Sequence, residues 1–197
     1  PVNPDQIIYL TAGDISGFYP LYNLNVVSGT KQKLGNAGYF LPSLNKNNWM
    51  VYCTIDNNLI KIKCNGDSAL ELTSDFRNIN PQWDYSGKNI YFFKQANLSI
   101  GSQIQKINNT NDLITVQFPA DIPQFASFKK SDKILYCQTS GTLATLVERT
   151  ISSGNERSLI AGPFNVKTGK VHFNHWCVDN NDEFAFWAND EGIFRFH

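Results

Sequence analysis

The sequence predicts an all-β fold, a β-propeller of about five four-stranded antiparallel blades. Two observations carry this prediction: the composition suits strands and turns, and a segment of about 40 residues recurs along the chain. Of the 197 residues, 42% are hydrophobic and 13% aromatic, whereas only 17% are charged. Strands favour aromatic and β-branched residues and turns favour Asn, Ser and Gly, whereas helices favour Glu, Lys, Arg and Ala. We therefore expect one all-β domain over residues 1–197.

The recurring segment starts with a proline, continues through an apolar residue and a polar turn, and ends in an apolar strand. Three copies begin at Pro42, Pro81 and Pro123. A fourth copy lacks the proline and starts at His175-Trp176-Cys177-Val178. Repeats of about 40 residues made of short strands are typical of propeller blades.

The remaining strands follow from local alternation and turn signals. In the second blade, residues 59–63 alternate apolar and polar, and Asn65-Gly66 predicts a hairpin turn before residues 69–73. The first residues match only the later strands of a blade, and the last residues only the earlier ones. We therefore expect blades at approximately 1–36 (partial), 37–75, 76–118, 119–162 and 163–197 (partial).

Two incomplete end blades leave three ways to arrange the chain. A five-blade ring closes with a rearranged seam, the chain belongs to a longer propeller, or an open arc is completed by another subunit. We expect the closed ring, because exposed apolar sheet faces promote aggregation.

One copy of the repeat carries a family resemblance. It reads Pro81-Gln82-Trp83-Asp84-Tyr85-Ser86-Gly87-Lys88-Asn89-Ile90-Tyr91-Phe92. This segment resembles the repeat of TolB-like propellers, Pro-x-Trp-Ser-Pro-Asp-Gly-Lys-x-Ile, although Tyr85 and Ser86 replace the family's Pro and Asp. The resemblance implies a propeller fold in a bacterial, extracytoplasmic setting, periplasmic or secreted. It leaves function open, because this repeat occurs in scaffolds, peptidase accessory domains and polysaccharide lyases.

Several function classes lack support in the sequence. The 17 basic and 17 acidic residues give a formal net charge of zero, so nothing favours binding to nucleic acid or to an anionic membrane. No apolar run approaches the roughly 20 residues of a membrane-spanning helix. Phosphate-loop, dinucleotide, zinc-protease and serine-hydrolase motifs are also missing. We therefore expect a non-enzymatic, cofactor-free interaction domain with a protein partner, and an oligosaccharide or small molecule is also compatible.

The candidate partner-binding residues lie near the expected loops at one end of the propeller, because varied loops on a rigid scaffold commonly carry function. Arg77 suits an anionic ligand, although a surface ion pair with Asp75 is the favoured interpretation. The full set of candidates is Phe18, Tyr19, Tyr39, Arg77, Asp121 and Asp190.

A carbohydrate-active enzyme is the alternative hypothesis. His172 and His175 precede an aromatic residue of an expected inner strand, which resembles oligogalacturonate lyases that bind a divalent metal at the propeller centre. The resemblance would make these two histidines metal ligands. The chain lacks the further histidines such a site requires, so we favour the interpretation in which His175 hydrogen-bonds a neighbouring blade and His172 is solvated.

The four cysteines lack the two-residue spacing of zinc and redox motifs. A disulfide between Cys53 and Cys64 across a hairpin is disfavoured by the expected strand register, which makes them diagonal neighbours. We expect buried free thiols at Cys53, Cys64, Cys137 and Cys177.

Overall fold

The computed structural model describes residues 5–12, 18–38, 42–109, 113–120, 125–140, 143–161, 175–178, 182, 185–189 and 192–196. Over these residues the chain forms antiparallel strands and no helix, in five sheets that follow one another along the sequence. The predicted all-β propeller fold is therefore confirmed. The described part of the chain contains no helix that could cross a membrane.

The first sheet has three described strands: β1 (Gln6–Leu10), β2 (Tyr19–Asn25) and β3 (Lys31–Ala37). The second sheet has four: β4 (Ser43–Leu44), β5 (Trp49–Cys53), β6 (Leu59–Lys63) and β7 (Leu70–Glu71). The third has β8 (Asn78–Trp83), β9 (Asn89–Lys94), β10 (Gln103–Asn108) and β11 (Ile114–Pro119).

The fourth sheet has β12 (Phe125–Ser127), β13 (Lys133–Ser140), β14 (Leu143–Thr150) and β15 (Glu156–Ala161). The fifth has three described strands: β16 (His175–Val178), β17 (Ala185–Asn189) and β18 (Gly192–Phe196). In each sheet the strands are ordered as in the sequence, which is the meander of a propeller blade.

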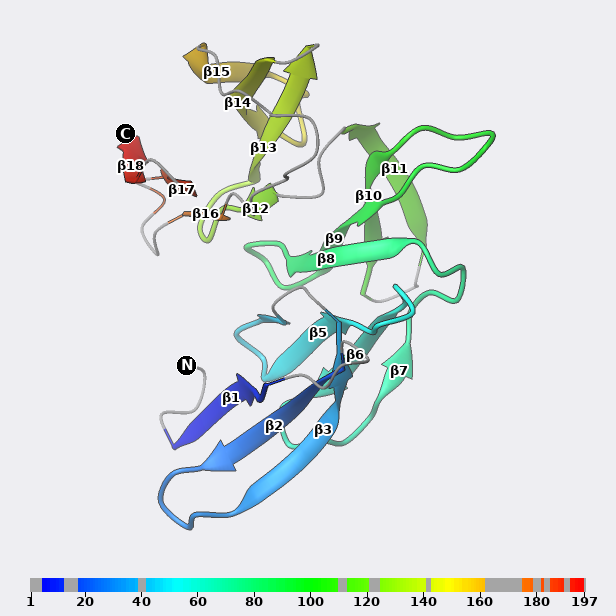
Figure 1. Cartoon of the computed structure of the whole chain (residues 1–197), viewed down its shortest axis with the longest axis vertical. Helices are drawn as coiled ribbons and strands as arrows, with labels where there is room; N and C mark the ends of the chain where they lie inside the picture. The colour runs from blue at the N-terminus through cyan, green and yellow to red at the C-terminus, as the bar shows by residue number, and fades with distance from the viewer. Residues whose placement is uncertain are drawn as a thin grey trace.

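The five sheets lie along an arc, with the first and last sheets on the same side of the view in Figure 1. Extensive contacts join β8 to β4, β5 and β6 of the second sheet, β8 to β12, and β12 to β16. No such contact joins the first sheet to the fifth among the described strands. The described part of the chain therefore does not show the closed ring that we expected.

The largest core cluster spans the second, third and fourth sheets. Strand β9 is buried on both faces, since Ile90, Tyr91, Phe92 and Phe93 are all at most 3% exposed. A strand with neighbours on both faces needs a continuous apolar run, which explains the absence of alternation there. Fully burying each large apolar side chain contributes about 1.5–3 kcal/mol.

A close approach joins the first sheet to the second. A Cβ atom at Gly35 would collide with the Tyr52 hydroxyl, so a larger residue at this position would force the Tyr52 side chain to move. Nearby, Nδ2 of the buried Asn23 donates a hydrogen bond of 2.7 Å to the Cys64 carbonyl. The two sheets are thus joined by a polar bond as well as by the shared core around Leu21 and Met50.

Side chains from the repeat tie neighbouring inner strands together. The Gln82 side chain donates from Nε2 to the Phe125 carbonyl at 2.8 Å and accepts from the Ser127 N–H at 3.0 Å. Ser43 Oγ accepts from the Trp83 N–H at 3.0 Å. The residue after the repeat proline therefore links its blade to the next one in two of the copies.

The third copy of the repeat is aligned differently from our expectation. Trp83 pairs with Ile90, and the corresponding pair in the fourth sheet is Ser127 with Ile134. Ser127, rather than Phe125, thus occupies the position of Trp83. The cause is that the strand-to-strand turns have matching lengths, which sets the register independently of where the proline lies.

Candidate functional site

The strand directions bring three loops, including the one that holds Arg77, to one end of the second and third sheets. Within the third sheet, Lys94 at the end of β9 pairs both with Asn78 at the start of β8 and with Gln103 at the start of β10. The β7–β8 loop therefore lies at the same end as the β9–β10 loop. The Asn78 N–H donates to the Asn57 carbonyl at 2.8 Å, which places the β5–β6 turn there too. We call residues 54–58 and 72–77 together the β7–β8 site.

Asn58 organises this site. It is 8% exposed, and its Oδ1 accepts a hydrogen bond of 3.0 Å from the Phe76 N–H. Its Nδ2 donates to Glu71 at 3.2 Å, and its own N–H donates to Thr54 Oγ1 at 3.2 Å. A buried side chain with these bonds fixes the path of the β7–β8 loop over the β5–β6 turn.

Phe76 is held in a conformation that phenylalanine rarely adopts. Its φ is +60°, in the left-handed region, and its side chain is 62% exposed. Left-handed backbone costs an ordinary L-residue roughly 1–2 kcal/mol, and such residues persist when their surroundings over-determine them. The bond from Asn58 is that constraint. Sequence reasoning missed Phe76, although an aromatic residue inside the polar run of residues 74–78 was an available signal.

Asp75 is held beside Phe76 by two donors. Its carboxylate accepts from the Asn78 side chain and forms an ion pair with Lys94. Partial burial alone would raise the pKa of this carboxyl, but the hydrogen bonds from Lys94 and Asn78 outweigh it and leave the pKa lowered. Our interpretation that Asp75 pairs with Arg77 is wrong, because Lys94 takes that place.

The Arg77 guanidinium makes no hydrogen bond or ion pair with the described residues. Its backbone carbonyl is fixed by a bond of 2.9 Å from the Gln95 N–H, and its side chain is half-buried. An unpaired guanidinium thus lies directly next to an exposed aromatic ring in the sequence. The predicted position of Arg77 at a loop end is consistent with this geometry.

The other predicted site residues are less informative. Phe18 and Tyr19 lie half-buried, Tyr19 as the first residue of β2 and Phe18 directly before it. His175 is the first residue of β16, and its side chain is not among those described. Outside the described residues are Tyr39, Asp121, His172 and Asp190.

The described thiols form no disulfide, and two of them are unsuited to nucleophilic chemistry. Cys53, Cys64 and Cys137 are buried thiols outside any disulfide, which confirms the prediction for these three, whereas the Cys177 side chain is not described. Burial raises the pKa of Cys53 to about 12 and also raises that of Cys64. The Cys53 thiol donates to the Thr54 and Asn78 carbonyls at 3.1 and 3.3 Å. A protonated, hydrogen-bonded thiol is a poor nucleophile.

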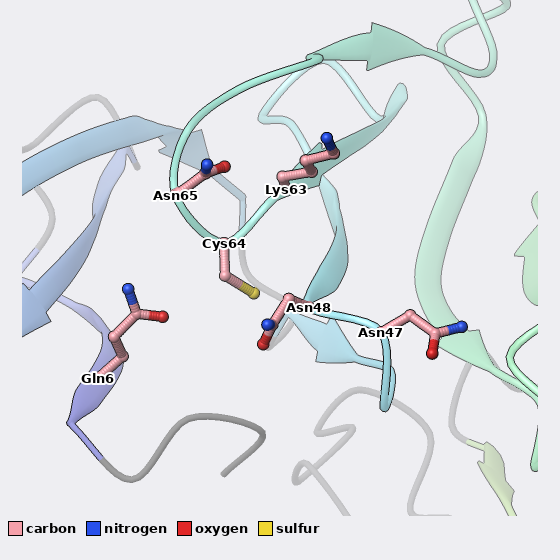
Figure 2. A pocket seen from close by; sticks show the side chains of 6 residues that line it. All are labelled: Gln6, Asn47, Asn48, Lys63, Cys64 and Asn65. Atoms are coloured by element: carbon pink, nitrogen blue, oxygen red, sulfur yellow. The ribbon is translucent and has the colours of Figure 1, made fainter.

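A separate pocket of about 320 Å³ lies between β1 and the second sheet (Figure 2). Its lining is Gln6, Asn47, Asn48, Lys63, Cys64 and Asn65. The amides and Lys63 have no acidic side chain among them, so the pocket would accommodate a small polar or anionic group. Most of these side chains are exposed to solvent, and none of the predicted site residues lines the pocket. Sequence reasoning had assigned its asparagines to turns.

No group of His, Cys, Asp and Glu side chains among the described residues could hold a metal ion. The β7–β8 site offers an exposed ring, a cation and a fixed carboxylate, and its neighbouring thiol is inert.

No family model matches the sequence, and no curated protein matches it either. Solved structures do resemble it. TolB from Acinetobacter baumannii has a TM-score of 0.65 at 14% identity, over 99% of this chain and 52% of that one. An oligogalacturonate lyase in complex with manganese has a TM-score of 0.69 at 10% identity, over 91% and 54%. In a nidogen/laminin complex the TM-score is 0.63 at 9% identity, over 98% and 76%.

These similarities show the fold alone, a β-propeller of the kind found in TolB and in oligogalacturonate lyase. The chain spans about half the length of those two proteins.

Proposed function

We propose that this chain is a non-enzymatic interaction domain of TolB-like type that binds a protein partner through the β7–β8 site. The observation that carries the proposal is the exposed Phe76 ring, which Asn58 holds in a strained left-handed conformation. Strain of this kind is retained mainly at functional sites. A core packing role does not account for it, since the ring is mostly exposed.

The composition of the site supports a protein partner. Aromatic and arginine side chains are enriched among the residues that dominate the energy of protein interfaces. Phe76 and the unpaired Arg77 supply one of each, side by side in the sequence. The hydrogen-bonded frame from Asn58 and Asp75 fixes the loop beforehand, so less conformational entropy is lost when a partner binds.

The test compares capture of partners from a lysate by the wild-type chain and by variants at the two ends of the sheets. Phe76→Ala combined with Arg77→Ala should abolish capture of a specific partner. Tyr85→Ala, at an exposed tyrosine in the β8–β9 turn, is the matched control and should leave capture intact. Titration calorimetry with the purified partner should then show at least a tenfold weaker affinity for the double variant. Equal affinity for all three chains would contradict the proposal.

We also propose a bacterial, extracytoplasmic setting, periplasmic or secreted, which the TolB-like repeat suggests. Fractionation of the source cells with an antibody against this chain tests it. Recovery in the cytoplasmic fraction would contradict it.

The enzymatic alternative is supported by the similarity to the manganese-bound lyase and by the place of His175 at the start of an inner strand. A metal bound only to the folded state at a hundred times its dissociation constant stabilises that state by about 2.7 kcal/mol. If this alternative holds, Mn²⁺ should raise the melting temperature and His172→Ala or His175→Ala should remove that effect. An unchanged melting temperature with Mn²⁺, EDTA or acidic oligosaccharides would count against it.

A further inference from the structure

Exposed apolar side chains gather on the outer part of the third sheet. Val116 is 58% exposed and Ile114 is 44% exposed, both on the outermost strand β11. Other large apolar side chains exposed in the β9–β11 region are Leu98, Ile100 and Leu113. A concentration of this kind marks an interaction surface more often than scattered single residues do.

Three other outer strands carry protection that β11 lacks. Strand β3 presents the exposed Lys31 and Lys33, and β15 presents the exposed Glu156 and Arg157. Strand β7 is only two residues long. Short length and charges are the usual means by which edge strands avoid pairing with other chains. Strand β11 is six residues long and contains no charged residue.

The backbone groups of β11 that face away from β10 belong to its two exposed apolar residues. The Val116 carbonyl accepts a bond of 3.3 Å from the Gln117 side chain, and its second lone pair is left for another donor. Among the described strands, β11 pairs only with β10. The Asn108 N–H donates to the Leu113 carbonyl at 3.2 Å, so the backbone N–H and C=O groups of Leu113 face β10. Because an antiparallel ladder alternates, Thr115 points the same way, whereas Ile114 and Val116 direct their N–H and C=O groups outward.

We propose that β11 pairs antiparallel with β11 of a second copy of this chain, across a two-fold axis at Thr115. In that register Ile114 faces Val116 of the second copy, and each such pair exchanges two backbone hydrogen bonds. Thr115 faces its own counterpart, and Thr–Thr pairs are favourable cross-strand neighbours. This register pairs the outward groups of both residues in both copies.

Charge favours a second copy as the occupant. The uncharged β11 meets no like-charge repulsion on pairing with itself, whereas β3 would bring its lysines together. The contact is small beside the roughly 1,200–2,000 Å² of a stable interface, so the dimer forms only at high protein concentration. It uses none of the residues of the β7–β8 site.

The first test is oxidative cross-linking of Thr115→Cys. Directly opposed residues of a non-hydrogen-bonded pair have Cα atoms about 4.5 Å apart, which is within the range of a disulfide. Thr115→Cys should form a covalent dimer at least ten times faster than Val27→Cys at equal concentration. Val27, 77% exposed in the β2–β3 turn, measures random collision of an exposed thiol, and the wild-type chain measures any reaction of its native thiols.

The second test is sedimentation velocity of the unmodified chain over a concentration series. The mean sedimentation coefficient should rise with concentration, and Val116→Lys should remove the rise, whereas Val27→Lys should retain it. The circular dichroism spectrum of Val116→Lys verifies that it folds. Equal cross-linking of the two cysteine variants, or a monomer at every concentration, would overturn the proposal. A monomer at every concentration would instead favour an extended segment of another protein as the strand that pairs with β11.

Discussion

The left-handed backbone of Phe76 costs folding free energy, and its exposed ring does not offset that cost by packing. The residue is left-handed, and its N–H is bound to the buried side chain of Asn58. The stability of the fold is therefore lowered by a strained residue whose ring lies in solvent. Pre-formed geometry of this kind is useful where a partner binds the ring.

Phe76→Gly should make the chain more stable by about 0.5–1 kcal/mol, because glycine adopts positive φ without steric cost. Phe76→Ala should bring no such gain, since alanine keeps the strain and removes only the ring. Urea unfolding of both variants measures the difference. A destabilised glycine variant would mean that the ring packs against the fold.

Asp75 should make folding stability depend on pH. Its pKa is lowered in the folded chain, so its contribution is present above the ordinary aspartate value of about 4 and is lost as pH falls through the folded value. Asp75→Asn should therefore unfold more readily than the wild type at pH 7, and the gap should narrow as the pH falls below the ordinary aspartate value.

Chemical denaturation at several pH values measures this gap. Asp56→Asn, at an exposed aspartate of the neighbouring β5–β6 turn, serves as the control. A gap for Asp75→Asn that persists at low pH would show that the side chain acts through its shape rather than its charge.

The residues of the site differ in how far sequence could reveal them. Arg77 was predicted because a lone arginine in a loop is conspicuous. The strain at Phe76 was out of reach, because its φ depends on Asn58, 18 positions away in the sequence. The partner of Asp75 was also mispredicted, because Lys94 is brought close by the pairing of β8 with β9.

Among the elements, the inner strands depend on side chains for their cohesion. The β8 and β12 strands belong to different sheets, and the Gln82 amide bonds the β12 backbone at both its oxygen and its nitrogen. It thus supplies a donor and an acceptor as a neighbouring strand would.

Gln82→Ala should destabilise the chain by about 1–3 kcal/mol, because it leaves buried backbone groups of Phe125 and Ser127 without partners. The stability of Gln82→Glu should lie between that of the wild type and that of Gln82→Ala, since a carboxylate still accepts from Ser127 but cannot donate to Phe125. Gln117→Ala is the control, because that amide bonds only within its own strand. Thermal unfolding ranks the variants, and equal losses for Gln82→Ala and Gln117→Ala would contradict the role of Gln82.

The strands themselves were largely predictable, since alternation and the Asn-Gly turn are enough to predict β6 and β7 of the second sheet. The repeat alignment of the fourth sheet was less so. An aromatic residue near a proline looked equivalent to Trp83, but the register is set by hydrogen bonds at the β12–β13 turn.

At the scale of the whole molecule, strand contacts join the second sheet to the third, the third to the fourth and the fourth to the fifth, and a side-chain bond and a shared core join the first sheet to the second. In such an array, stability is close to a sum of the sheets and their junctions. The Asp182 carboxylate, between β16 and β17, accepts from the N–H groups of Lys129 and Lys130 at 2.5 and 2.7 Å and from the Ser131 hydroxyl at 2.9 Å. It ties the fifth sheet to the fourth.

Asp182→Ala should therefore act locally. Amide hydrogen exchange should accelerate at residues 129–131 and in β16 and β17, while β5 and β6 of the second sheet keep their wild-type rates. Mass spectrometry of peptic fragments resolves these regions. A uniform acceleration along the chain would show instead that the array unfolds as one cooperative unit.

The buried thiols can report how often different parts of this molecule open. Cys64 lies at the junction of the first and second sheets, Cys53 at the junction of the second and third, and Cys137 within the fourth. A thiol reagent can modify each sulfur only while its surroundings are open. The labelling rates of single-cysteine variants would therefore report, one junction at a time, how often the arc comes apart in the native state.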